Sequence, residues 1–199
     1  FPRLDYAEAI ARFGLDKPDT RFALELKDIS DIVADAGFKV FASVVKKGGI
    51  VKALNAKGCI DFTRKEIDDL TEFVAVYRAR GLAWIKVNDA GAGIEGLQSP
   101  IAKFLDDKAW NGIAEQTGVE TGDLLFFGAG DWLTTSTFMG HLLVRCGEDL
   151  ELAKEGWKPL WVTDFPMNEW DEESDGFMAM HYPCTAPQSD TPDEWKATA

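Results

Sequence analysis

The sequence contains little cysteine, little histidine and no long apolar run. Its 199 residues include three cysteines (Cys59, Cys146 and Cys184) and two histidines (His141 and His181). The cysteines are odd in number, widely spaced and without a CxxC pair, which argues against a disulfide framework or a structural zinc site. No apolar run approaches the roughly 20 residues of a membrane-spanning helix. The first residues also lack the apolar core of a secretion signal. We therefore expect a cytoplasmic protein with no membrane contact.

Basic residues are also scarce. The chain has 21 Lys and Arg against 34 Asp and Glu, a net charge of −13. Residues 1–21 carry four basic and four acidic side chains, residues 22–152 carry 14 and 20, and residues 153–199 carry 3 and 10. Because nucleic-acid affinity depends on Lys and Arg displacing counterions from phosphate, we expect weak or no nucleic-acid binding by this chain. An acidic surface that serves solubility alone explains the same excess.

Apolar periodicity and turn residues predict alternating helices and strands. Capping boxes are expected at Asp5 with Glu8 and at Thr63 with Glu66. The expected helices lie at 5–14, 27–36, 63–80, 99–117 and 132–146. The expected strands lie at 38–45, 50–54, 82–87, 123–129, 159–165 and 177–182.

The first two of these strands form a hairpin around Gly48-Gly49, which implies antiparallel pairing. A loop is expected at 88–98, and an acidic loop at Glu169–Asp175. We predict an α+β fold in which a mixed, largely antiparallel sheet is flanked by helices, rather than a doubly wound parallel sheet.

Several residues that could have a catalytic or metal-binding role can also be explained as structural or surface residues. From the pattern alone, His181 is a histidine at the end of an apolar strand, and His141 packs on a helix surface. Asp164, Glu169 and the acidic run 171–173 could hold magnesium, but a solvated acidic loop accounts for them because no general base or phosphate cradle accompanies them.

The remaining candidates are a glycine pair and two thiols. Gly128-Ala129-Gly130 lacks the full glycine spacing of a dinucleotide-binding turn. Cys59 and Cys146 have no activating neighbours in the sequence, so we expect inert, buried thiols.

Several stretches of the chain share one resemblance. They include Phe1-Pro2-Arg3-Leu4-Asp5-Tyr6, Lys17-Pro18-Asp19-Thr20-Arg21, Gly81-Leu82-Ala83-Trp84-Ile85-Lys86-Val87, Asp164-Phe165-Pro166-Met167-Asn168-Glu169 and Met180-His181-Tyr182-Pro183-Cys184. In order and spacing they closely resemble bacterial-type aspartyl-tRNA synthetase. The middle of the chain resembles the domain that is inserted in that family and also occurs in the B subunit of tRNA-dependent amidotransferases.

The resemblance implies an internal segment of a longer synthetase. Residues 1–21 would be an edge of the class II antiparallel-sheet catalytic domain, residues 22–152 the inserted α+β domain, and residues 153–199 the return to the catalytic domain. This interpretation requires the first twenty or so residues and the last forty to share a sheet or to have adjacent ends.

The family joins aspartate to ATP, with magnesium bridging phosphate oxygens, and then passes the aspartyl group to tRNA. Its main ATP and aspartate ligands lie outside Phe1–Ala199. The resemblance therefore implies a homodimeric parent enzyme that uses aspartate, tRNA, ATP and Mg. It also implies a chain that by itself is inactive, with no catalytic residue, metal ligand or bound cofactor.

His181 and Tyr182 are the expected substrate-binding residues, in a segment that closes over bound aspartate in the family. The family has a second histidine where Tyr182 stands, and Phe where Cys184 and Asn168 stand. Tyrosine keeps one hydrogen-bond donor but no positive charge at neutral pH.

The alternative hypothesis is a non-catalytic module centred on residues 22–152 that contacts the tRNA acceptor arm or a partner protein. Its net charge of −6 would limit any tRNA contact to a light, shape-based one.

Overall fold

The computed structural model describes residues 1–171 and 174–180, and the chain divides into two compact units. The larger unit is Ala9–Lys158, and the smaller unit combines Phe1–Glu8 with the chain from Pro159 onward. This spatial division falls after Glu8 and Lys158. The functional borders expected after residues 21 and 152 stay a prediction.

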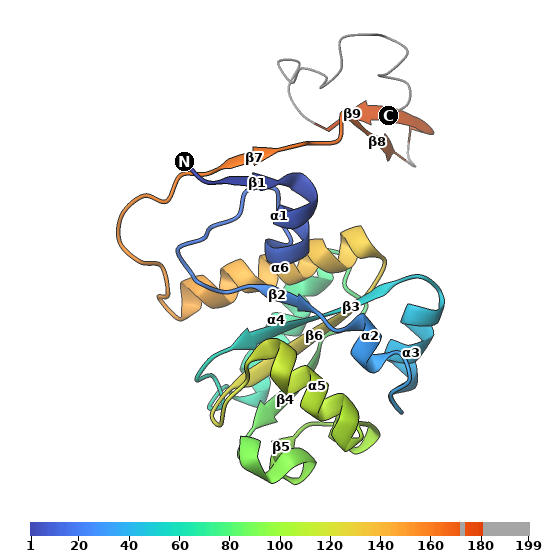
Figure 1. The fold of residues 1–199 in the computed structure, drawn as a ribbon, viewed down its shortest axis with the longest axis vertical. Helices are drawn as coiled ribbons and strands as arrows, with labels where there is room; N and C mark the ends of the chain where they lie inside the picture. The colour runs from blue at the N-terminus through green and yellow to red at the C-terminus, as the bar shows by residue number, and fades with distance from the viewer. Residues whose placement is uncertain (172–173, 181–199) are drawn as a thin grey trace. The chain divides into compact units, whose positions relative to one another are not determined.

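The larger unit is built on a five-stranded antiparallel sheet with the strand order β2-β3-β6-β4-β5 (Figure 1). Its strands are β2 (Leu26–Asp28), β3 (Ile50–Ala56), β6 (Leu124–Gly130), β4 (Ala83–Val87) and β5 (Leu97–Gln98). This sheet confirms the predicted antiparallel α+β fold.

Helices cover both faces of the sheet. These are α2 (Ser30–Val33), α3 (Lys39–Lys46), α4 (Arg64–Ala75), α5 (Asp107–Thr117) and α6 (Trp132–Asp149). The chain also has 3-10 turns η1 (Ala90–Gly96) and η2 (Ala102–Phe104), and helix α1 (Tyr6–Phe13), whose residues belong to neither core on this sheet. One core packs α4 and α6 on the sheet, and the other packs α2, α3 and α5 on the opposite face. None of the helices in the described part of the chain has the length and apolarity to cross a membrane.

The two central strands alternate their side chains between these cores. Leu54 and Phe126 lie in the α4–α6 core, whereas Ala53, Leu125 and Phe127 lie in the α2–α3–α5 core. Successive residues of a strand point to opposite faces. Because both faces are covered, β6 carries no polar side chain, and β3 carries only Lys52 and Asn55 among apolar residues.

Local sequence signals begin two helices as expected. Glu8 N–H donates to Asp5 Oδ1 at 2.7 Å ahead of α1. In the capping box of α4, Thr63 N–H donates to Glu66 Oε2 at 2.6 Å and Glu66 N–H donates to Thr63 Oγ1 at 3.3 Å. These bonds satisfy N–H groups that have no partner within the first helical turn.

The predicted hairpin strand at 38–45 is wrong, because Lys39–Lys46 forms helix α3. Phe41, Val44 and Val45 follow the i, i+3, i+4 spacing of a helix as well as a strand-like apolar run. Phe41 is buried against the sheet, with its ring 6.0 Å from that of Phe127, while Val40 stays 54% exposed. This packing overrides the strand preference of the valines.

Three other boundaries also differ from expectation. Residues 27–28 belong to β2, because β3 pairs with them through Lys27↔Ala53 and Asp28↔Lys52. The helix expected from residue 99 begins at Asp107, where Asp106 Oδ1 accepts Ala109 N–H at 2.8 Å. The expected acidic loop begins as strand β8.

The smaller unit pairs a strand near the start of the chain with a strand that follows the larger unit. Strand β1 (Arg3–Asp5) pairs in parallel with β7 (Trp161–Thr163). A separate hairpin joins β8 (Asn168–Asp171) to β9 (Gly176–Ala179), with Trp170 and Phe177 rings 5.2 Å apart. The β1–β7 pair is the shared sheet that an interrupted domain requires.

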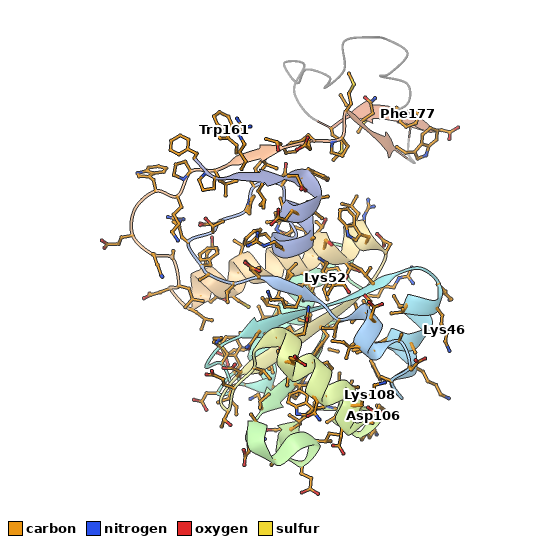
Figure 2. All side chains as sticks on the ribbon, in the orientation of Figure 1. Lys46, Lys52, Asp106, Lys108, Trp161 and Phe177 are labelled. Atoms are coloured by element: carbon orange, nitrogen blue, oxygen red, sulfur yellow. The ribbon has the colours of Figure 1, made fainter. Side chains whose placement is uncertain are left out.

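A buried lysine links the sheet to the end of α1. Lys52 of β3 is only 1% exposed, and its Nζ donates to the Ala11 carbonyl in the last turn of α1 (Figure 2). This carbonyl has no partner within the helix. Burial lowers the pKa of Lys52 from its ordinary value of 10.5, and the nearby Asp28 carboxylate opposes that shift.

We expect K52M to change how stability depends on pH. The pKa of Lys52 in the folded chain lies below its ordinary value of 10.5. Between these two pKa values the unfolded chain binds more protons than the folded chain. The free energy of unfolding of the wild type therefore increases as the pH rises through this range. Denaturant unfolding from pH 7 to 10.5 should show wild type gaining stability relative to K52M. K108M, at an exposed position of α5, serves as the control with no such trend. Parallel pH profiles for wild type and K52M would contradict the assignment.

Candidate functional site

A contact between two glycines places the loop that follows α1 against α6. Gly14 has φ +74°, and a Cβ there would lie 2.1 Å from the Ser136 carbonyl oxygen. A Cβ on Gly140 would lie 2.7 Å from the Phe13 oxygen and 2.8 Å from Gly14 Cα. No other residue fits this backbone-to-backbone approach. The contact fixes where the loop of residues 14–22 begins its path over the helix.

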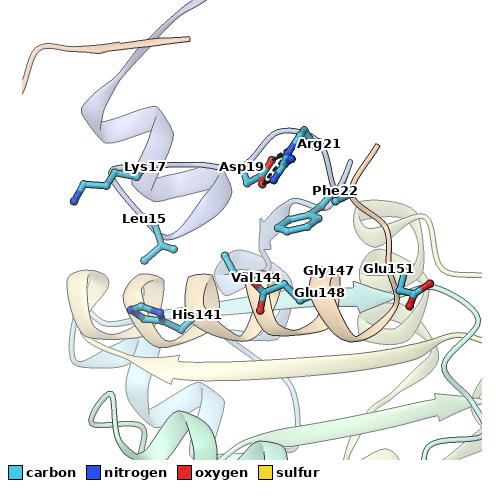
Figure 3. A pocket seen from close by; sticks show the side chains of 11 residues that line it. Leu15, Lys17, Asp19, Arg21, Phe22, His141, Val144, Gly147, Glu148 and Glu151 are labelled. Atoms are coloured by element: carbon cyan, nitrogen blue, oxygen red, sulfur yellow. Dashed lines mark hydrogen bonds and ion pairs between the residues drawn. The ribbon is translucent and has the colours of Figure 1, made fainter. Parts of the chain in front are cut away.

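Beyond this crossing, the loop and α6 enclose a cavity of about 520 Å³ (Figure 3). Its apolar lining includes Leu15, Phe22 and Val144. The Phe22 ring lies on Gly147 of α6, where a Cβ would come within 2.6 Å of the ring. The charged lining groups are Lys17, Asp19, Arg21, Glu148 and Glu151, so the cavity carries both signs of charge.

Asp19 and Arg21 form a two-pronged ion pair at the mouth of the cavity. Arg21 Nη2 lies 2.6 Å from Asp19 Oδ2, and Arg21 Nε lies 3.0 Å from both carboxylate oxygens. Arg21 N–H also donates to Asp19 Oδ1 at 2.9 Å. The side-chain hydrogen bond from Arg21 lowers the pKa of Asp19, and the same bond raises the pKa of Arg21. Both groups therefore stay charged at neutral pH.

His141 lines the cavity from α6 and packs on a neighbouring ring. Its ring stacks on Tyr77 with centroids 3.7 Å apart and 13° between the planes. Burial lowers the pKa of His141 below 6.5, so the imidazole is neutral at pH 7. This arrangement confirms the predicted helix-surface packing.

The cavity lining offers charged and aromatic groups for a small polar ligand but no nucleophile hydrogen-bonded to a base. Cys59 and Cys146 are buried, as expected, and burial raises their pKa to about 11 and about 12. Across residues 1–171 and 174–180, no group of three His, Cys, Asp or Glu side chains could hold a metal ion.

The predicted substrate residues His181 and Tyr182 lie outside the described residues, as does Cys184. Asn168 lies at the start of β8. Asp164 follows β7 with φ +58°, and its Oδ2 accepts a hydrogen bond from Thr163 Oγ1 at 2.8 Å.

The ion pair between Asp19 and Arg21 is a feature of the site that the sequence analysis did not predict. Gly128 belongs to strand β6 and allows close packing of Phe138, to whose ring a Cβ would come within 2.5 Å. This glycine therefore serves helix packing, which agrees with rejecting a dinucleotide turn.

A family model described as the GAD domain matches residues 41–139 of the chain. Over nearly its whole length the chain is also homologous to a segment of bacterial-type aspartyl-tRNA synthetase, as the sequence resemblance predicted.

Three relatives show this likeness. The aspartate–tRNA(Asp/Asn) ligase of Desulfosudis oleivorans is 53% identical over 188 residues, which cover 94% of this chain and 31% of the relative. The ligase of the same name from Desulfatibacillum aliphaticivorans is 52% identical over 191 residues, 96% of this chain and 31% of the relative. That of Syntrophotalea carbinolica is 52% identical over 187 residues, with coverage of 94% and 31%. The chain thus spans about 31% of the length of these curated relatives.

We expect G140A to destabilise the larger unit by about 1–3 kcal/mol, because the new methyl group meets backbone atoms that cannot move aside. Chemical denaturation would measure the loss. The matched control is G81A, whose Cβ meets no atom within 4 Å, so its stability should equal or slightly exceed wild type. Equal stability of the two variants would contradict the glycine contact.

We expect R21Q to raise the Asp19 pKa toward its ordinary value of 3.8, because the hydrogen bonds that favour the carboxylate are lost. A carboxyl-carbon NMR titration would follow Asp19 directly. R145Q removes one arginine from α6 outside the cavity lining and should leave the Asp19 titration unchanged. An unshifted Asp19 in R21Q would show that the ion pair does not persist in solution.

Proposed function

We propose that this chain is a segment of an aspartate–tRNA ligase of the tRNA(Asp/Asn) type. Such a ligase activates aspartate with ATP and transfers it to tRNA. The observation that carries the proposal is 52–53% identity over 94–96% of the chain to ligases of that name. Identity at this level through both units supports a shared role for the flanking strands as well as for the GAD domain. On this proposal the parent enzyme is a cytoplasmic homodimer.

The same comparison supports the idea that ATP is bound by a part of the ligase other than this chain. The chain corresponds to 31% of each relative, so we propose that the residues that bind ATP and its magnesium lie in the remaining part of the ligase. The described residues hold no cluster suited to a metal ion, and we assign them no step through magnesium. The 199-residue chain alone would then form no aspartyl-adenylate.

Within that ligase, His181 and Tyr182 are proposed to contact the aspartate substrate. A histidine can donate a hydrogen bond to the substrate carboxylate and attract it when protonated. Tyr182 supplies a hydroxyl donor without a charge. A change of Tyr182 to histidine should therefore strengthen aspartate binding.

A binding module is the alternative. The GAD match covers residues 41–139 and so falls inside the larger unit alone. This unit could contact a tRNA acceptor arm or a partner protein without taking part in catalysis, and its net negative charge would keep any tRNA contact weak.

A chimera separates the two functions. The matching segment of the Desulfosudis oleivorans ligase is replaced by this chain, and aspartate-dependent ATP–pyrophosphate exchange and tRNA charging are measured. We expect activity in the chimera and none in the isolated chain.

Within the chimera, H181A should raise the KM for aspartate about tenfold or more, given ~1.5–3 kcal/mol for a hydrogen bond to a charged group. Y182H should lower that KM. K108Q on the exposed face of α5 is the unchanged control. A folded but inactive chimera, together with tRNA binding by the isolated chain, would favour the binding module. Exchange activity in the isolated chain would overturn the proposed location of the ATP ligands.

A further inference from the structure

A second hollow lies where residues of the two cores meet. This groove, about 370 Å³ in volume, runs between the start of α3, the start of β4 and the end of β6. Its apolar lining includes Phe38, Phe41, Leu82, Trp84, Ile101 and Phe127. Phe38 and Phe41 meet edge to face at 4.7 Å, which gives the groove a firm aromatic wall.

The charged groups that line the groove are both arginines, Arg64 and Arg80. This is unusual for a chain in which acidic residues outnumber basic ones by 34 to 21. Arg64 lies over the Trp84 ring, with Cζ 5.6 Å from its centroid, and bonds Asp68 through Nε at 2.9 and 3.1 Å. The Arg64 side chain stays 65% exposed beside the groove. Arg80 is exposed in the bend before β4.

The end of β6, whose Ala129 lines the groove, also offers an open strand edge. β3 pairs with β6 as far as Ile50↔Gly130, whereas β4 pairs with β6 only as far as Ala83↔Phe127. In the described part of the chain, Gly128–Gly130 therefore has a strand on one side only. An extended peptide can add to such an edge through main-chain hydrogen bonds while its side chains enter adjacent pockets.

We propose that this groove binds an extended acidic segment of a partner protein. A bulky apolar side chain of the segment fills the aromatic groove, flanking carboxylates meet Arg64 and Arg80, and its backbone pairs beside Gly128–Gly130. Charge-assisted bonds from arginine to carboxylate suit this geometry. A nucleic-acid strand would need a row of cations along its phosphates, and two arginines over an apolar floor do not provide one.

A labelled peptide tests the proposal. The probe is acetyl-Asp-Glu-Leu-Phe-Glu-Asp-amide, and its comparator replaces each acidic residue with lysine. Fluorescence anisotropy with the 199-residue chain should give saturable binding of the acidic probe, with a Kd on the order of 100 µM. The lysine comparator should not bind.

Variants at the rim locate the site. R64Q and R80Q should each weaken binding by about fivefold or more, whereas R145Q, which also removes one positive charge, should not. Val40 lines the groove and is 54% exposed, so V40E and V40K form a matched pair in which only V40E weakens binding. If circular dichroism shows that V40E has unfolded, the peptide binding of R80Q, a change at an exposed position, decides whether the groove is the binding site.

Two results would overturn the proposal. One is the absence of saturable binding, or binding that R64Q and R80Q leave unchanged. The other is binding of a single-stranded oligoadenylate hexamer that both variants abolish, without peptide binding, which would assign the groove to nucleic acid.

Discussion

The register between β3 and β6 is the constraint on which both hollows depend. Seven residue pairs join these strands, from Ile50↔Gly130 to Ala56↔Leu124. Because side chains alternate between two separate cores, a slip of one residue would turn every side chain of one strand to the wrong face. Lys52 would then enter the aromatic core beneath α3 and α5 in place of its contact with α1.

A buried polar network secures one end of that register. Asn55 Nδ2 donates to Asp123 Oδ2 at 2.9 Å, and the two Asp123 oxygens also accept N–H bonds from Gly58 at 2.9 Å and Glu120 at 3.0 Å. These three hydrogen bonds offset the free-energy cost of removing the Asp123 carboxylate from water. It also links the turn after β3 to the turn before β6, so the two strands start and finish opposite one another.

The parts of the structure that follow from the sequence are those with local causes. Thr63 and Glu66 lie three residues apart and accept hydrogen bonds from each other's backbone N–H at the start of α4. Their spacing alone is therefore enough to predict where this helix begins. Helix α3 could not be predicted in this way. Its valines favour a strand, and the helix depends on the tertiary contact between Phe41 and Phe127. Both hollows join distant residues. The glycine contact that shapes the first pairs positions 14 and 140, and the second collects side chains from α3, the region around α4 and the sheet. Such contacts depend on tertiary packing, which no short window of sequence contains.

The parallel pairing of β1 with β7 has a consequence for how the larger unit is joined to the chain. Neighbouring parallel strands cannot be closed by a tight turn, and they need a crossover of a dozen or more residues. Here the crossover is a whole compact unit of the chain, Ala9–Lys158. A shortened protein without that domain could keep the strand pair only if a linker of about that minimal length carried the chain from one end of the pair back to the other. A two-residue hairpin would make the two strands antiparallel instead of parallel.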